Sequence, residues 1–251
     1  FAEESIDACY VPVLVDEVAD LFRLAERLPL LGFSVTIPHK RAVMAHLTET
    51  GDDVRAADAC NTVLRIPGGW RGVNTDVIGF LAPLDEVLAT PLSGLRVLVL
   101  GAGGAARGVV YALASRGATV VVWNRTVARA ESLVDELGRI VGSTALSVLQ
   151  AGTDGRPIEV PAVDIVVNTT SVGMHGEGDP APWYRFAGHE IAYDIVYTPP
   201  DTPLVERAAA AGTGKYGEAP MLAERVRAGE LPPVDERLPV NPLVWNHPDV
   251  L

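Results

Sequence analysis

The sequence of 251 residues has little cysteine, almost no lysine and no long apolar run. Two cysteines, Cys9 and Cys60, are too few for a disulfide framework, and neither they nor the histidines stand at a spacing typical of metal ligands. We therefore expect ordinary thiols and no metal site. No apolar run approaches the length of a membrane span. The formal net charge of −12 opposes binding to nucleic acid or anionic lipid, so neither partner is expected.

Lysine is much the rarer of the two strongly basic residues. Only Lys40 and Lys215 are lysines, and the other eighteen of the twenty basic residues are arginines. Arginine stays protonated in proteins, whereas lysine can take part in proton transfer when its surroundings favour the neutral amine. Lys40 is therefore a candidate functional residue, and the chance retention of a surface lysine is the alternative.

The remaining composition is typical of a globular protein. Hydrophobic residues make up 48% of the sequence and charged residues 21%. No basic segment followed by an apolar segment marks a secretion signal, so a cytoplasmic location is expected. This expectation concerns only the residues from Phe1 onward, because the sequence does not open with Met.

Strand-like and helix-like segments alternate along the chain, which predicts an α/β fold with parallel strands. The pattern changes at the turn-forming residues 91–94. We expect residues 93–212 to form a nucleotide-binding domain of the Rossmann type. Residues 1–92 are expected to form a separate α/β unit, which the C-terminal residues 213–251 join.

The expected elements follow from hydrophobic periodicity and turn signals. In the first unit, helices are expected at residues 15–27, 39–47 and 76–88, and strands at 32–37, 61–66 and 70–73. In the second unit, strands are expected at 95–100, 118–123, 163–168 and 191–196, and helices at 105–114, 127–137 and 203–211.

A glycine-rich loop follows the first buried strand of the second unit. It reads GAGGAARG and contains the pattern G-x-G-x-x-A between a strand and a helix. The first glycine permits a tight turn, the second lets the backbone approach a pyrophosphate, and the helix N-terminus supplies N–H groups. The complete strand–loop–helix–strand context favours a dinucleotide site. The expected contacts in this loop are Gly101, Ala102, Gly103, Gly104 and Ala105.

The residues after the second buried strand indicate which dinucleotide binds. An NAD enzyme usually places Asp or Glu here to accept a hydrogen bond from the ribose 2′-hydroxyl. This chain has Asn124, Arg125 and Thr126, with Arg129 one helical turn further on. Two guanidinium groups and a hydroxyl suit a 2′-phosphate, so the sequence predicts NADP. The alternative is a solvated helix start in which Thr126 is the N-cap.

Three polar clusters precede the nucleotide-binding unit. They read SVTIPHK at residues 34–40, CNT at 60–62 and NTD at 74–76. The first leaves a strand at Pro38 and places Lys40 at the start of an expected helix, whose positive end disfavours an ammonium ion. Taken singly, Lys40 is a surface lysine and either Thr75 or Asp76 caps a helix. Taken together, a Lys–Asp pair can hold and pass a proton while hydride moves to or from a carbon.

At these motifs the chain resembles the shikimate dehydrogenase family. The matching segments are 34–40, 60–62, 74–76, 101–108, 124–126, 168–174 (NTTSVGM) and 194–204 (DIVYTPPDTPL). Members of that family reduce 3-dehydroshikimate to shikimate with NADPH, on the pathway to aromatic amino acids. The resemblance implies an N-terminal substrate domain, a Rossmann domain and a cleft between them. We expect a monomer or a homodimer.

The resemblance also implies roles for single residues. Lys40 and Asp76 are implied as the catalytic pair, and Thr36, Asn61 and Tyr197 as substrate contacts. Further implied cofactor contacts are Thr169, Ser171, Met174 and Met221.

The chain departs from the family pattern in three places. Members carry a Ser-x-Ser-Pro motif whose serines bind the substrate carboxylate, and the sequence starts after that point. We expect either that an N-terminal segment with a strand precedes Phe1, or that half of the carboxylate site is lacking. Ser34 stands where many members have Asn, and Arg225 stands where a substrate-binding Gln is usual. Arg225 either replaces lost contacts or indicates a different substrate such as quinate.

Two alternatives to a shikimate dehydrogenase stay open. One is a quinate or shikimate-type dehydrogenase that acts on a related cyclitol acid, which the altered C-terminal pattern favours. The other is an NADP-binding regulatory or degenerate paralogue without turnover, which the missing serines and the altered C-terminal pattern favour. The retention of Lys40, Asp76 and Asn61 disfavours this second alternative.

Overall fold

The computed structural model describes residues 7–212, apart from a few positions within that range. The positions left out are Ile37, Ala89, 143–144, Ala151, 153–155, His175, Tyr197 and Pro200. The predicted substrate contact Tyr197, the cofactor contact Met221, Arg225 and the expected return of residues 213–251 to the first unit therefore lie outside the described residues. In the described part, no helix is long and apolar enough to cross a bilayer.

The first sheet has four strands in the order β1–β3–β4–β2. These strands are β1 (Gly32–Ser34), β2 (Glu49–Thr50), β3 (Thr62–Ile66) and β4 (Gly69–Val73). Strands β3 and β4 form an antiparallel hairpin, whose turn needs glycine at Gly68 because its φ is +85°. Helix α1 (Val18–Ala25) buries Val18 and Phe22 in the same apolar cluster as Trp70 of β4.

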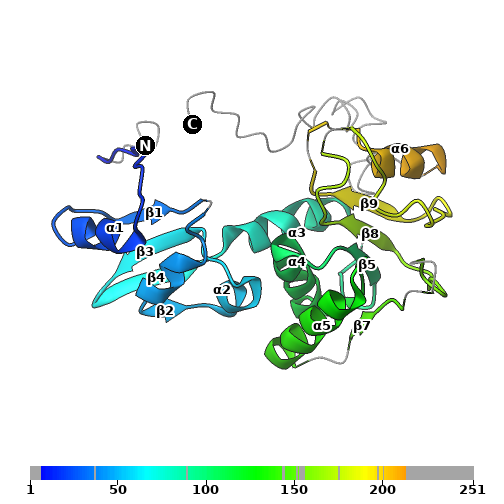
Figure 1. Cartoon of the computed structure of the whole chain (residues 1–251), viewed down its shortest axis with the longest axis horizontal. Coiled ribbons are helices and arrows are strands. Elements are labelled where there is room, and N and C mark those ends of the chain that lie inside the picture. Colours follow the sequence, from blue (N-terminus) through cyan, green and yellow to red (C-terminus); the bar gives the residue numbers. More distant parts are fainter. Residues whose placement is uncertain are drawn as a thin grey trace, which may run out of the picture.

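The second sheet has five parallel strands in the order β7–β6–β5–β8–β9, which is the Rossmann order (Figure 1). They are β5 (Arg96–Leu100), β6 (Thr119–Trp123), β7 (Leu146–Val148), β8 (Ile165–Asn168) and β9 (Ile191–Asp194). Its helices are α4 (Gly104–Ser115), α5 (Val127–Val141) and α6 (Pro203–Ala210). The central strands β5 and β8 are buried on both faces, as their continuous apolar runs predict. The predicted α/β fold with a Rossmann domain is confirmed.

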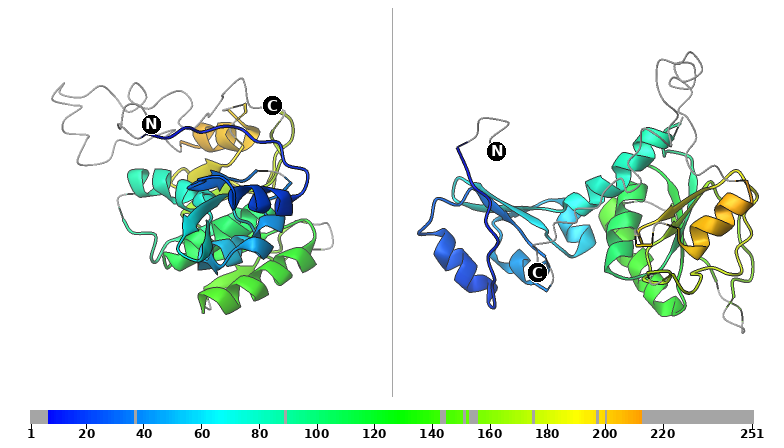
Figure 2. Two further views of the ribbon diagram at one scale, coloured as in Figure 1. Left: turned by 90° about the vertical axis from the view of Figure 1, so that its left-hand side faces the viewer. Right: turned by 90° about the horizontal axis from the view of Figure 1, so that it is seen from above.

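Helix α3 (Thr75–Val87) joins the two sheets and packs along α4 (Figures 1 and 2). Near the start of both helices, a Cβ placed on Gly108 of α4 would lie 3.6 Å from Cγ2 of Val77. Near their ends, the guanidinium of Arg116 donates to Asp85 over 2.6 Å. The two helices therefore run side by side in the same direction, and their N-termini lie at the same side of the molecule. The division of the chain at residues 92 and 93 stays a prediction.

The expected α-helix at residues 39–47 is wrong. Residues 38–41 form turns, and a 3₁₀ helix η1 follows at Ala42–His46. In an α-helix the carbonyl oxygen of Lys40 would accept from the N–H of Met44, but it accepts from Cys60 N over 2.8 Å. This bond ties the segment to the chain just before β3, so the argument from a helix N-terminus at Lys40 does not apply.

Three short elements are absent from the sequence-based expectations. They are β2, β7 and helix α2 (Asp52–Ala57). Each is shorter than the window over which hydrophobic periodicity is informative. Strands β2 and β7 form at sheet edges by pairing with β4 and β6, so their existence depends on neighbours far away in the sequence.

Candidate active site

Lys40 and Asp76 lie together although 36 residues separate them. Nζ of Lys40 donates to Oδ2 of Asp76 over 2.9 Å. Lys40 belongs to the turn before η1, and Asp76 to the first turn of α3. The side chains are 33% and 64% exposed, so the pair is open to a bound molecule. The fold thus brings together the two residues predicted to pass a proton.

Asn61 holds the carboxylate of Asp76 from its other oxygen. Nδ2 of Asn61 donates to Oδ1 of Asp76 over 2.8 Å. Oδ1 of Asn61 accepts from the backbone N–H of Thr75 over 2.9 Å and from the hydroxyl of Thr62 over 3.0 Å. Because an amide nitrogen cannot accept a hydrogen bond from the N–H of Thr75, the amide of Asn61 has one orientation. Thr62 and Thr75 belong to the CNT and NTD clusters, but the sequence reasoning did not give either of them this supporting role.

Asn74 is the N-cap of α3. Its Oδ1 accepts from the backbone N–H of Asp76 over 3.0 Å. Its own N–H donates to Oδ2 of Asp53 over 2.7 Å, and its Nδ2 donates to the carbonyl oxygen of Ala59 over 2.9 Å. The alternative in which Thr75 or Asp76 caps the helix is therefore wrong. A signal for this was present in the sequence, because Asn is among the preferred N-cap residues.

The other residues of the first cluster have separate positions. Thr36 is exposed, and its carbonyl oxygen accepts from the backbone N–H of His39 over 2.9 Å. Nε2 of His39 forms a hydrogen bond of 2.8 Å with the carbonyl oxygen of Val15, which gives this histidine a structural contact. Within the described residues, no group of three His, Cys, Asp or Glu side chains could hold a metal ion.

Cys60 lies next to this site but belongs to the core. The thiol is fully buried, and its Sγ donates to the carbonyl oxygen of Thr62 over 3.2 Å. Burial raises the pKa of the Cys60 thiol and outweighs the hydrogen bonds to backbone carbonyls, which lower it. A thiol with a raised pKa is a poor nucleophile, so Cys60 is an ordinary packed residue.

The glycine loop leaves open space in front of α4. Gly101 must be glycine, because its φ is +112° and a Cβ there would lie 2.7 Å from Oγ1 of Thr169. A Cβ at Gly103 or Gly104 would meet no atom within 4 Å. Ala105 in the first turn is exposed, and Ala102 packs partly on the core. The N-terminus of α4 is thus accessible to an anion at the carboxyl edge of the parallel sheet.

Two exposed arginines follow the end of β6. Arg125 precedes α5 and Arg129 lies in its first turn, and within the described residues neither forms an ion pair. Asn124 donates from Nδ2 to the carbonyl oxygen of Thr126 over 2.8 Å. Thr126 occupies the N-cap position of α5, but its side chain forms no capping bond. Both guanidinium groups and the Thr126 hydroxyl are therefore available to an anionic ligand.

The loop after β8 contains the remaining predicted cofactor contacts. The hydroxyl of Thr169 is buried and donates to the carbonyl oxygen of Leu100 over 2.7 Å. This bond joins the ends of β8 and β5, so the hydroxyl hydrogen of Thr169 is used within the protein. Ser171 is exposed and Met174 is 48% exposed, so both side chains can be reached from solvent.

Two family models match the chain. The shikimate dehydrogenase substrate binding domain matches residues 1–63, and the shikimate/quinate 5-dehydrogenase family matches residues 85–172. A shikimate dehydrogenase (NADP+) from Salinibacter ruber is 36% identical over 247 residues, which cover 95% of this chain and 86% of that protein. The chain belongs to the shikimate dehydrogenase family.

Solved structures of the family share the fold. One is shikimate 5-dehydrogenase from Thermus thermophilus in complex with NADP(H) and shikimate, with a TM-score of 0.60 and 33% identity. The match covers 83% of this chain and 77% of that one. Another is quinate dehydrogenase from Corynebacterium glutamicum in complex with NAD, with a TM-score of 0.67 and 31% identity over 78% of this chain and 70% of that one. The structural neighbours of this chain thus differ in their named substrates and cofactors.

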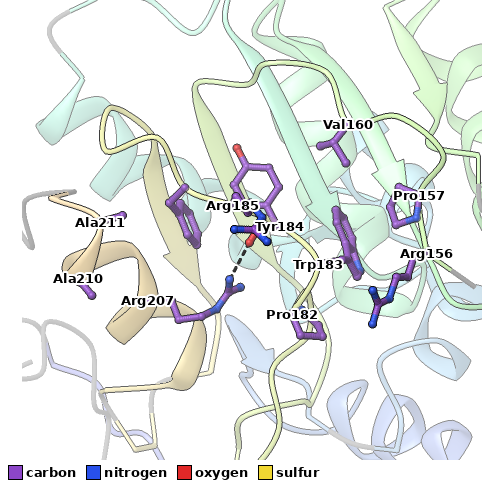
Figure 3. A pocket seen from close by; sticks show the side chains of 11 residues that line it. Arg156, Pro157, Val160, Pro182, Trp183, Tyr184, Arg185, Arg207, Ala210 and Ala211 are labelled. Carbon is purple, nitrogen blue, oxygen red and sulfur yellow. Dashed lines mark hydrogen bonds between the residues drawn. The ribbon is translucent and has the colours of Figure 1, made fainter.

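This family member also has a hollow of about 780 Å³ on its Rossmann domain (Figure 3). Trp183, Tyr184 and Arg207 line it, together with other residues that lie before β8, between β8 and β9, and at the end of α6. The guanidinium of Arg207 donates to the carbonyl oxygen of Tyr184 over 2.7 Å and pairs with Asp179, so its charge is used within the fold. No predicted catalytic, substrate or cofactor residue lines this hollow.

A Gly103→Ala variant separates the cofactor role of the loop from its structural role. We expect its free energy of unfolding to change by about 1 kcal/mol at most, because the new methyl group meets no protein atom. The methyl group would face an approaching pyrophosphate, so the Kd of NADP should rise by at least about tenfold. Fluorescence titration and urea unfolding measure the two quantities. Gly101→Ala is the contrasting variant and should destabilise the fold itself. Unchanged NADP affinity in Gly103→Ala would contradict the assignment of this loop.

Proposed function

We propose that this chain catalyses the reversible, NADP-dependent reduction of 3-dehydroshikimate to shikimate. The observation that carries the proposal is the cluster of Lys40, Asp76 and Asn61 at the start of α3, which packs beside the helix that begins at the glycine loop. The relatives named as shikimate dehydrogenase (NADP+) and the related structure with NADP(H) and shikimate support the same reaction.

Lys40 and Asp76 would move the proton. Reduction of a ketone leaves an alkoxide on the substrate, and that alkoxide must be protonated. The ammonium of Lys40 forms an ion pair with Asp76, and it can stabilise the developing negative charge and relay a proton. Asp76 holds this ammonium through Oδ2, while Asn61 fixes the carboxylate through Oδ1. In the oxidation of shikimate the same groups would accept the proton.

The residues of the Rossmann domain fit NADP. Nicotinamide supplies or accepts the hydride when the cofactor is bound. The open N-terminus of α4 suits the pyrophosphate, with Gly101 to Ala105 around it. Arg125, Arg129 and Thr126 would bind the 2′-phosphate, and Asn124 shapes their turn. Thr169, Ser171, Met174 and Met221 would line the rest of the cofactor site.

Substrate contacts are proposed on the first unit and on the loop after β9. Asn61 keeps a second N–H on Nδ2 that can bind a substrate hydroxyl, because only one is used by Asp76. Thr36 is exposed on the same segment as Lys40. Tyr197 completes the proposed set. A small-molecule substrate, a monomer or homodimer and a cytoplasmic location form part of this proposal.

Quinate is the second candidate substrate. Quinate dehydrogenase from Corynebacterium glutamicum has a similar fold, and its structure contains NAD. An exposed Lys–Asp pair can serve either cyclitol acid. The pair of arginines after β6 favours NADP over NAD in this chain. The intact Lys40–Asp76 contact argues against a regulatory paralogue without turnover.

The direct test follows nicotinamide absorbance with shikimate or quinate and with NADP or NAD. We expect fast turnover only with shikimate and NADP. Turnover mainly with quinate or NAD would instead support the quinate dehydrogenase alternative. No turnover with any pair, despite measurable NADP binding, would support the regulatory paralogue.

Lys40→Met and Asp76→Asn each remove one partner of the proposed catalytic pair with little change in size. We expect kcat to fall by about 10²- to 10⁴-fold in each, the usual contribution of a positioned acid or base. NADP affinity should stay near the wild-type value, because neither side chain belongs to the Rossmann domain. Arg41→Ala is the control, since it removes the neighbouring exposed ion pair with Asp58. Wild-type turnover in either test variant would remove that residue from the mechanism.

Arg125→Asp places a carboxylate where the 2′-phosphate is proposed to bind. We expect kcat/KM with NADP to fall by about 10- to 100-fold, as for the loss of one hydrogen bond to a charged group, and the preference to shift towards NAD. Arg139→Asp makes the same charge change at the other end of α5 and should keep the wild-type NADP/NAD ratio. An unchanged ratio in Arg125→Asp would show that Arg125 does not read the 2′-phosphate.

A further inference from the structure

The ends of β8 and β9 carry a polar network that no role assigned so far uses. The carboxylate of Asp194, the last residue of β9, accepts three hydrogen bonds. Oδ1 accepts from Nδ2 of Asn168 and from the backbone N–H of Val196, each over 2.9 Å. Oδ2 accepts from the hydroxyl of Thr202 over 2.7 Å. One carboxylate thus joins the end of β8, the residues after β9 and the N-cap of α6.

Asn168 extends this network into the loop after β8. Its side chain is fully buried, and its Nδ2 also donates to the carbonyl oxygen of Val172 over 3.1 Å. Its Oδ1 accepts from the backbone N–H of Thr170 over 3.0 Å and from the Thr170 hydroxyl over 2.7 Å. The amide of Asn168 therefore shapes the turn that leads to the proposed cofactor contacts Ser171 and Met174.

The network lies next to α3, the helix that carries Asp76 of the proposed catalytic pair. Tyr193, which precedes Asp194, packs its ring edge-on against Phe80 of α3 with ring centroids 4.9 Å apart. Figure 1 shows β8 and β9 side by side, with α6 beside β9. The loops that follow the two strands lie at the carboxyl edge of the parallel sheet, where Rossmann domains bind their ligands.

We infer that Asp194 is a positioning residue: it holds the loops after β8 and β9 in the one arrangement in which cofactor and substrate meet. The inference rests on the proposed function, because those loops carry the proposed contacts Ser171, Met174 and Tyr197. Asp194 forms no ion pair within the described residues, so three neutral donors alone stabilise its charge. Burial raises the pKa of Asp194 and outweighs the lowering effect of these donors. Burying part of a carboxylate without a neighbouring cation costs free energy. In return, the hydrogen bonds of Asp194 fix the shape of the two loops.

The same strand offers a matched control at its other end. Glu190, just before β9, is 3% exposed and accepts from the hydroxyl of Tyr184 and from the backbone N–H groups of Ala187, Gly188 and His189. Burial raises the pKa of Glu190, but its hydrogen bonds hold the net value below the ordinary one. Glu190 lies at the amino edge of the sheet, away from the proposed ligands.

The test compares Asp194→Asn with Glu190→Gln in steady-state kinetics, alongside thermal unfolding of both variants. For Asp194→Asn we expect the KM for NADP to rise and kcat to fall, each by about tenfold, the size of one lost hydrogen bond to a charged group. Glu190→Gln should lower Tm at least as much, but its KM and kcat should stay within about twofold of wild type. A structural role alone would lower Tm in both variants and leave both kinetic constants unchanged.

Thr202→Val and Thr202→Ser supply a second test if Asp194→Asn does not fold. The serine variant keeps the hydroxyl that donates to Oδ2 of Asp194, and the valine variant removes it. We expect a raised KM for NADP in Thr202→Val only. Wild-type constants in Asp194→Asn, or equal constants in the two Thr202 variants, would overturn the inference. An inactive wild-type enzyme would instead overturn the proposed function.

Discussion

Val77 of α3 packs against α4 beside Gly108, and this contact helps to set the relation between the two sheets. Because the ends of the same helices are joined by Arg116 and Asp85, α3 and α4 run in one direction. Asp76 lies in the first turn of α3, and α4 begins at the glycine loop, so parallel packing places both N-termini at one side of the molecule. The parallel packing therefore brings the group proposed to transfer a proton and the proposed dinucleotide loop to the same side of the molecule.

Hydrogen bonds fix the orientations of the polar side chains near this contact. Asn61 has its carbonyl side fixed by the N–H of Thr75, and this leaves Nδ2 facing Asp76. Asn74 satisfies the N–H of Asp76, so the Asp76 carboxylate is not needed as a cap and can face Lys40. Each of these side chains is constrained by partners on other elements. A buried polar group left without a partner costs more free energy than a single hydrogen bond contributes, so these pairings are strongly favoured.

The fold class could be predicted from local patterns. Parallel buried strands read as continuous apolar runs, and β5, β6 and β8 match those runs closely. Elements whose existence depends on distant pairing could not be predicted, as β2 and β7 show. The segment after Pro38 was misjudged for the same reason, because the hydrogen bond from Cys60 to the carbonyl of Lys40 replaces a helical one.

By itself, the sequence determined which chemical groups are present: one lysine before the nucleotide-binding unit, a glycine loop between a strand and a helix, and two arginines without a carboxylate after the second buried strand. These signals are local, because each can be recognised from the residues that adjoin it in the sequence. Only the tertiary structure decided that Lys40 meets Asp76, that Asn61 orients this pair, and that Asp194 joins two loops at the sheet edge. Those contacts join residues far apart in the chain, and the packing of helices and sheets selects them from many possible partners.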